Sequence, residues 1–158
     1  MKAKVISIVT FCLLLTGFSQ ADEASEKAMK AAIAMTKARQ GFMRLQAQQL
    51  GKMGTAAKGA GPIDAVTIQG AQNLYNLTQM FPDIFGAGSS MEDLELSNAK
   101  PDVWTMQEEL GGFIARLERQ SERLLTMAKA GDSAGFKDEF KQVSGTCKKC
   151  HEIFRFVP

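Results

Sequence analysis

The sequence has few of the residues that most often carry chemistry: its 158 residues include one histidine, three cysteines, one tyrosine and one tryptophan. Three cysteines are too few for a disulfide scaffold. No stretch alternates apolar and polar residues long enough to predict a β-strand. The longest apolar run, residues 5–15, is too short to span a membrane as a helix. These absences exclude disulfide-rich, β-sheet and membrane-spanning classes and leave an all-α protein.

The N-terminus has the three parts of a secretory signal peptide. Lys2 and Lys4 precede the apolar run, and "SQA" at residues 19–21 offers small residues for cleavage. We therefore expect residues 1–21 to be a signal peptide cleaved near Ala21 and the protein to be periplasmic; a retained membrane anchor is the alternative. Cys12 lies in the apolar run and would be lost with the signal peptide.

The remaining chain, residues 22–158, is predicted to form one domain with a substantial core. The full chain has 19 basic and 17 acidic residues, and two of the basic ones are lysines of the signal peptide. The mature chain is therefore formally neutral, with 17 of each sign. Nothing in this charge balance predicts nucleic-acid binding.

Helical periodicity of apolar residues appears in four segments. The first covers about 23–53 and the second about 64–80, and a long surface loop is expected over 82–100. The third helical segment begins with Pro101 in its first turn. Gly111 and Gly112 lie within this segment and predict either a bend in the helix or a close approach by another group. The fourth follows a turn at 130–135, with Asp132 or Ser133 as its N-cap. Four such helices with mostly short connections predict an antiparallel, up-down-up-down four-helix bundle.

The fourth segment has one regular apolar stripe. Its members are spaced 4, 3, 4, 3 and 4 residues apart, as on the buried side of an amphipathic helix: Phe136, Phe140, Val143, Cys147, Cys150 and Phe154.

Cys147, Cys150 and His151 form the motif CxxCH. At i, i+3 and i+4 the three side chains share one helical turn. This is the attachment signature of a c-type haem: two thiols form thioethers with the two vinyl groups, and the histidine becomes an axial ligand of the iron. The predicted export agrees with covalent haem attachment, which takes place outside the cytoplasm.

Three other interpretations of the motif are open. A structural zinc site needs four ligands, so zinc would have to recruit carboxylates or a second chain. A thioredoxin-like dithiol should follow a strand in a βαβ unit, and this motif lies in the fourth helix of an all-α chain. The last alternative is a chance motif that includes a core histidine.

Three stretches resemble the class II c-type cytochromes, the cytochrome c′ family. "CKKCHEIFR" is similar to the family's C-terminal signature, and residues 38–59, "ARQGFM…LGKMGTAAKG", are similar to its first helix and the turn that follows. "FPDIF" and the later "PDVW" resemble its second loop and the start of its third helix. The resemblance covers essentially the whole mature chain.

The resemblance implies a four-helix bundle that encloses one covalently attached haem c. It assigns the thioethers to Cys147 and Cys150 and the proximal ligand to His151. It also implies that Arg155 lies near the proximal imidazole and Arg39 near a haem propionate. Members of the family are often dimers through their first two helices, so the resemblance leaves both a homodimer and a monomer open; the redox partner proteins are not identifiable from the sequence.

The sixth coordination position divides the family. In high-spin cytochromes c′ an apolar residue covers the distal side and the five-coordinate iron binds gases such as nitric oxide. In a low-spin branch, a methionine of the first helix is the sixth ligand and the protein transfers electrons. The family's distal position falls on Met43 here, and a thioether is a soft ligand suited to haem iron.

We therefore predict a one-electron carrier, not an enzyme, with Met43 as sixth ligand. The alternatives are Met43 as core filler and Phe42 as the cap of a five-coordinate, gas-binding site. Met35 and Met53 share much of the same helical face, but each lies about 12–15 Å from Met43 along the axis.

Overall fold

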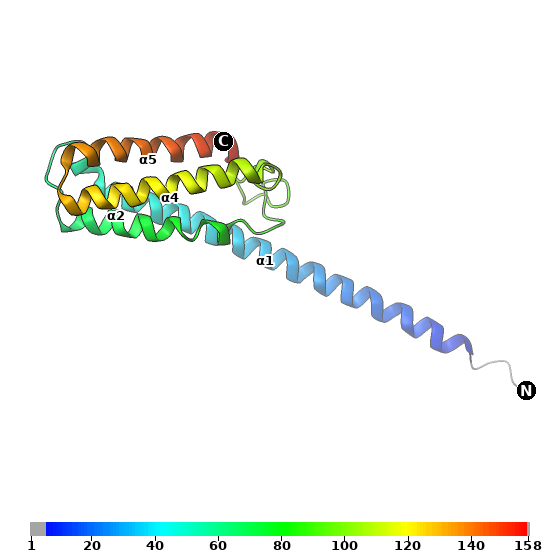
Figure 1. Cartoon of the computed structure of the whole chain (residues 1–158). Coiled ribbons are helices and arrows are strands. Elements are labelled where there is room, and N and C mark those ends of the chain that lie inside the picture. The colour runs from blue at the N-terminus through cyan, green and yellow to red at the C-terminus, as the bar shows by residue number, and fades with distance from the viewer. Residues whose placement is uncertain (1–5, 158) are drawn as a thin grey trace, which may run out of the picture.

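The computed structural model describes the backbone of residues 6–157 and the side chains of residues 22–157. This part of the chain is helical, apart from loops and one isolated β-bridge. The elements are α1 (Ile6–Ala57), α2 (Ala65–Thr78), the 3₁₀ helix η1 (Phe81–Ile84), α3 (Asp102–Thr105), α4 (Gln107–Ala130) and α5 (Ser133–Phe154). The long helices α1, α2, α4 and α5 form a four-helix bundle, which confirms the predicted fold class (Figure 1).

Each long helix packs against the next one along the chain, and α5 returns to α1. Successive long helices run antiparallel, joined by short turns except for the long segment between α2 and α4 (Figure 1). The largest fully buried side chains form a continuous core, among them Met53, Leu74, Leu124, Phe136 and Val143. Among these four neighbouring pairs, the packing is sparsest between α1 and α5. The bundle is therefore most open on the side where the CxxCH turn lies.

Helix α1 is longer than predicted. The sequence predicts a start near Glu23, but the helix is continuous from Ile6 through the expected cleavage point at Ala21. Its N-terminal part projects away from the bundle, and residues 22–31 are exposed (Figure 1). The side chains of the predicted signal peptide, including Cys12, lie outside the described residues. Within the part that is described, no helix combines the length and apolarity needed to cross a membrane.

Side-chain caps define the starts of α2 and α5. Asp64 accepts hydrogen bonds from the backbone N and the Oγ1 of Thr67, both at 2.8 Å. Asp132 accepts a hydrogen bond from the backbone N of Gly135 at 3.0 Å. These are N-caps that satisfy free N–H groups of the first turn. Asp132, and not Ser133, therefore caps α5.

The third predicted helix is interrupted. It breaks at Met106 (φ −112°, ψ 52°) into α3 and α4. The side-chain amide of Gln107 donates to the carbonyl of Val103 at 2.6 Å, the acceptor that the backbone N–H of Gln107 would use in a continuous helix. Gly111 and Gly112 lie inside α4, and a Cβ at either position would have no other side chain or distant backbone within 4 Å. A close approach by another part of the chain is therefore not the reason for these glycines.

The segment between η1 and α3 is less superficial than predicted. Ser89, Ser97 and Ala99 are buried, although the sequence predicts a surface loop there. The end of this segment pairs with the end of α5: the backbone N of Lys100 donates to the carbonyl of Phe154 at 3.0 Å. A bridge also joins Ala99 to Arg155. The loop is thereby fixed over the C-terminal end of the CxxCH helix.

Candidate functional site

Two adjoining hollows lie beside the CxxCH turn. The inner hollow measures about 90 Å³ and reaches into the bundle as far as Leu50 and Leu117. The outer hollow measures about 500 Å³ and extends to the loop and the end of α5. Five residues line both of them: Met43, Ala47, Leu110, Cys150 and His151. The two hollows therefore form one continuous site between α1, α4 and α5.

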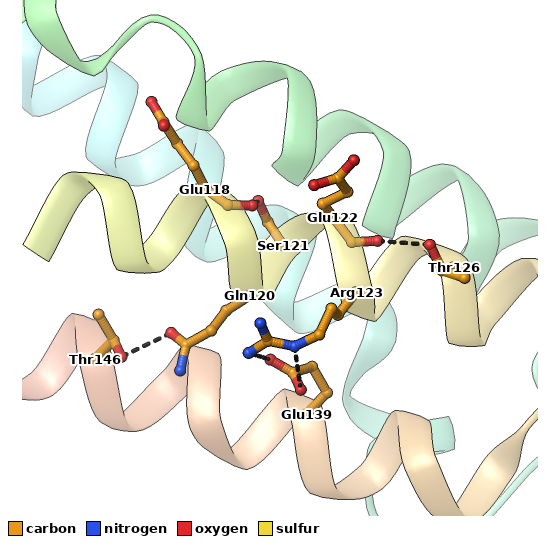
Figure 2. Close-up of polar contacts among 8 residues, drawn as sticks. All are labelled: Glu118, Gln120, Ser121, Glu122, Arg123, Thr126, Glu139 and Thr146. Carbon is orange, nitrogen blue, oxygen red and sulfur yellow. Dashed lines mark hydrogen bonds and ion pairs between the residues drawn. The ribbon is translucent and has the colours of Figure 1, made fainter.

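The inner hollow is almost entirely apolar. Aromatic and aliphatic side chains of α1, η1 and α4 make most of its wall, and Gln46 and Thr146 are its uncharged polar side chains. Thr146 donates from Oγ1 to Oε1 of Gln120 on α4 at 2.7 Å (Figure 2). That bond ties α5 to α4 one residue before Cys147. Such a wall suits a large, flat, mainly apolar group.

The three residues of the motif lie on the last turns of α5, half-buried. Burial raises the pKa of the Cys147 thiol, and burial together with Cys147 raises the pKa of Cys150 to about 11. The cysteines are not joined in a disulfide. Burial, and then the positive charge of Arg155, lowers the pKa of His151. The imidazole is thereby kept neutral, as a metal ligand must be, while the thiols lack the low pKa of a reactive dithiol.

Three arginines line the outer hollow: Arg39, Arg44 and Arg155. No carboxylate is among the described residues that line it. Guanidinium groups bind carboxylates with paired, charge-assisted hydrogen bonds. The rim of the site is therefore suited to an anionic group, and the two propionates of a haem are such groups.

Arg39 is the most buried of these arginines, with 5% of its surface exposed. It donates to Oγ and O of Ser89 at 2.9 and 2.7 Å and to Oγ of Ser97 at 3.1 Å. Its guanidinium carbon also lies 5.9 and 5.8 Å from the ring centroids of Phe85 and Trp104. Burial lowers the pKa of Arg39. Besides lining the site, this side chain therefore fastens the loop to α1.

The structure separates the three methionines of the first helical face. Met43 lines both hollows together with His151. Met35 lies under the loop: a Cβ at Gly86 would be 3.0 Å from its Cγ. Met53 is fully buried in the core, where its Cγ would be 3.2 Å from a Cβ at Gly70. Of the three, Met43 alone therefore reaches the site.

Phe42 lies away from both hollows. Its ring packs edge-on against Phe81 at a centroid distance of 5.2 Å, in the core. The other predicted site residues line the hollows. The sequence analysis missed Gln46, which is buried in the inner hollow three residues after Met43. Its position at i+3 from a candidate ligand was a signal that could have identified it.

The donor set fits a haem better than a bare metal ion. Among the described residues, no group of three or more His, Cys, Asp or Glu side chains could hold a metal ion. Two thiols one helical turn apart, a neutral imidazole, an apolar inner wall and an arginine rim match the parts of a c-type haem.

Comparison with known proteins agrees with this geometry. The family model described as Cytochrome C' matches residues 34–155. Cytochrome c-554 of Cereibacter sphaeroides is 33% identical over 124 residues, which are 77% of this chain and 80% of the relative.

Two solved structures are similar over most of the chain. Cytochrome c′ from Rhodobacter sphaeroides has a TM-score of 0.73 at 29% identity and covers 80% of this chain and 98% of its own. The nitric oxide complex of a mutant cytochrome c prime from Alcaligenes xylosoxidans has a TM-score of 0.72 at 25% identity, with 80% and 97% covered. The chain therefore belongs to the cytochrome c′ family, whose cofactor is a covalently attached haem c, and Cys147 and Cys150 agree with its CxxCH attachment motif.

Proposed function

We propose that the protein is a periplasmic one-electron carrier whose haem iron is ligated by His151 and Met43. The observation that carries this proposal is the position of Met43: it lines the same two hollows as His151, while Met35, Met53 and Phe42 are held elsewhere. Haem c, when bound, supplies an iron that exchanges one electron. A thioether in the sixth position leaves no open site for a gas.

The other residues of the site bind and shield the cofactor in this proposal. Cys147 and Cys150 form the two thioethers, and the apolar inner wall excludes water. Arg39 and Arg155 face the propionates at the rim, where the described lining includes no carboxylate to oppose them. The low dielectric of the inner hollow favours the less charged, ferrous form of the site and so raises its reduction potential.

The same proposal includes the processing and assembly of the chain. Residues 1–21 are cleaved as a signal peptide, and residues 22–158 form the mature cytochrome. The mature chain forms a homodimer through α1 and α2. Leu45 of α1 and Val66 of α2 are exposed apolar side chains that such an interface would cover.

The spin state of the ferric protein tests the ligation. We expect low-spin optical and EPR spectra for the wild type and conversion to high-spin in Met43→Leu. Met35→Leu is the matched control, since Met35 lies on the same helix under Gly86, and it should remain low-spin. A high-spin wild type that binds carbon monoxide in the ferrous state would refute Met43 ligation. That result would instead support a gas-binding function for this protein, like the binding of nitric oxide by the mutant Alcaligenes xylosoxidans protein.

A further inference from the structure

Gln46 is an isolated donor in the inner hollow. It has 5% of its surface exposed, and its side-chain Nε2 is buried without a hydrogen-bond partner among the described residues. It lines the inner hollow beside Met43 and Thr146. Thr146 already donates its own proton to Gln120 at 2.7 Å. A buried amide N–H₂ group without an acceptor is costly, so an acceptor is expected in the occupied site.

Helix geometry directs the Gln46 side chain toward Met43. Residues three apart on a helix are neighbours, about 5–6 Å between their Cβ atoms. Side chains on a helix also lean back toward its N-terminus, so Gln46 covers the turn that contains Met43. Both residues line the same hollow. The Met43 sulfur is therefore the candidate acceptor contributed by the same helix.

We propose that Gln46 donates a hydrogen bond from Nε2 to the Sδ of Met43 and thereby sets the reduction potential. This proposal rests on Met43 being the sixth ligand. A thioether sulfur that binds iron through one lone pair keeps a second one, which can accept a weak hydrogen bond. Gln46 is thus a positioning residue, because it acts on the iron through Met43.

The bond has a definite electronic consequence. A donor on the sulfur withdraws electron density, and the sulfur is a better acceptor when the iron is ferrous than when it is ferric. The positive end of the N–H dipole also disfavours the additional positive charge of the ferric state. Both effects favour reduction. Loss of the bond is expected to lower the reduction potential.

Redox titration of holoprotein variants tests the proposal. In Gln46→Leu the equilibrium constant for reduction should fall about three- to tenfold, which at 59 mV per tenfold for one electron is about 30–60 mV. Gln49→Leu is the matched control: Gln49 is also buried on α1, but its amide is already partnered by the carbonyl of Leu45 and by Asn73. That variant should lose stability and keep its potential.

A second measurement needs no variant. In the diamagnetic ferrous wild type, the side-chain amide protons of Gln46 should show nuclear Overhauser contacts with the ε-methyl group of Met43 and slow exchange with solvent. Contacts of these protons with Thr146 only would overturn the proposal. So would potentials that are unchanged in Gln46→Leu or equally lowered in Gln49→Leu.

The two proposals can fail separately. A low-spin wild type that becomes high-spin in Met43→Leu, combined with an unaltered potential in Gln46→Leu, would refute the role of Gln46 and leave the ligation intact. A high-spin wild type would refute both.

Discussion

Replacing Arg39 with leucine tests whether this side chain holds the loop over the site. Arg39 makes three hydrogen bonds of 2.7–3.1 Å to Ser89 and Ser97, 50 and 58 residues further along the chain. In Arg39→Leu all three are lost. Both serines keep a hydrogen bond without Arg39, because Ser97 still donates to the carbonyl of Ser89 and Ser89 still donates to the carbonyl of Gly86.

The magnitude follows from burial and charge. A hydrogen bond to a charged group contributes about 1.5–3 kcal/mol, and with 5% of Arg39 exposed there is little screening by solvent. Removal of a desolvated cation and burial of leucine offset part of the loss. We expect a net destabilisation of about 2–4 kcal/mol. At about 2 kcal/mol per molar urea, the midpoint of unfolding should fall by about 1–2 M.

Urea unfolding and hydrogen exchange of the holoprotein measure this effect. Exchange should accelerate first at the loop amides of Met91 and Leu94, which donate to Ala99 and Ser90. Arg44→Leu is the matched control, since Arg44 lines the same hollow but is exposed, and it should change stability by no more than about 0.5 kcal/mol. Equal stability of Arg39→Leu and wild type, or unchanged loop exchange, would refute the anchoring role.

Two further predictions concern the rest of the bundle. Arg123 donates from Nε and Nη2 to the buried carboxylate of Glu139 at 3.1 and 2.8 Å and joins α4 to α5 (Figure 2). Arg123→Leu leaves that carboxylate unpaired and should lower the free energy of unfolding, measured in urea, by about 1–2 kcal/mol. Glu139→Leu should lower it less, because the half-exposed arginine can turn toward water. A larger loss in Glu139→Leu than in Arg123→Leu would contradict this. Asp64→Ala should reduce stability near neutral pH. Hydrogen bonds from the backbone and side chain of Thr67 lower the pKa of Asp64, so the deficit should shrink as the pH falls through that lowered pKa; a deficit of unchanged size in acid would contradict the cap.

The CxxCH helix could be predicted almost completely from the sequence. Its apolar residues recur every three or four residues, and this spacing predicts both the helix and the apolar face of the helix on which Cys147 and Cys150 lie. The cap at Asp132 is equally local, because it depends on a backbone N–H three residues away. In this helix, the features that depend on short sequence separations were predicted well.

The polar residues of the site were not predictable in the same way. Periodicity assigns Gln46 and Arg39 to a face of α1, but whether a polar side chain at that position is covered depends on partners elsewhere in the chain. Arg39 is covered by a loop with no periodicity, and Gln46 by an apolar wall made by other elements. The break at Met106 also escaped prediction, since one side-chain hydrogen bond of Gln107 competes with the backbone pattern.

The rotation of α1 about its axis explains why the identity of the distal residue could not be obtained from spacing alone. Phe42 and Met43 are adjacent, so at 3.6 residues per turn their side chains point about 100° apart, and a rotation of that size would exchange them. The observed rotation is held by contacts distant in sequence, namely Phe42 against Phe81, Met53 beside Gly70 and Arg39 on the loop serines. These contacts turn Phe42 into the core and leave Met43 in the hollow with His151. The choice between an electron carrier and a gas-binding protein therefore depends on how α2, η1 and the loop orient α1 as much as on the presence of a methionine.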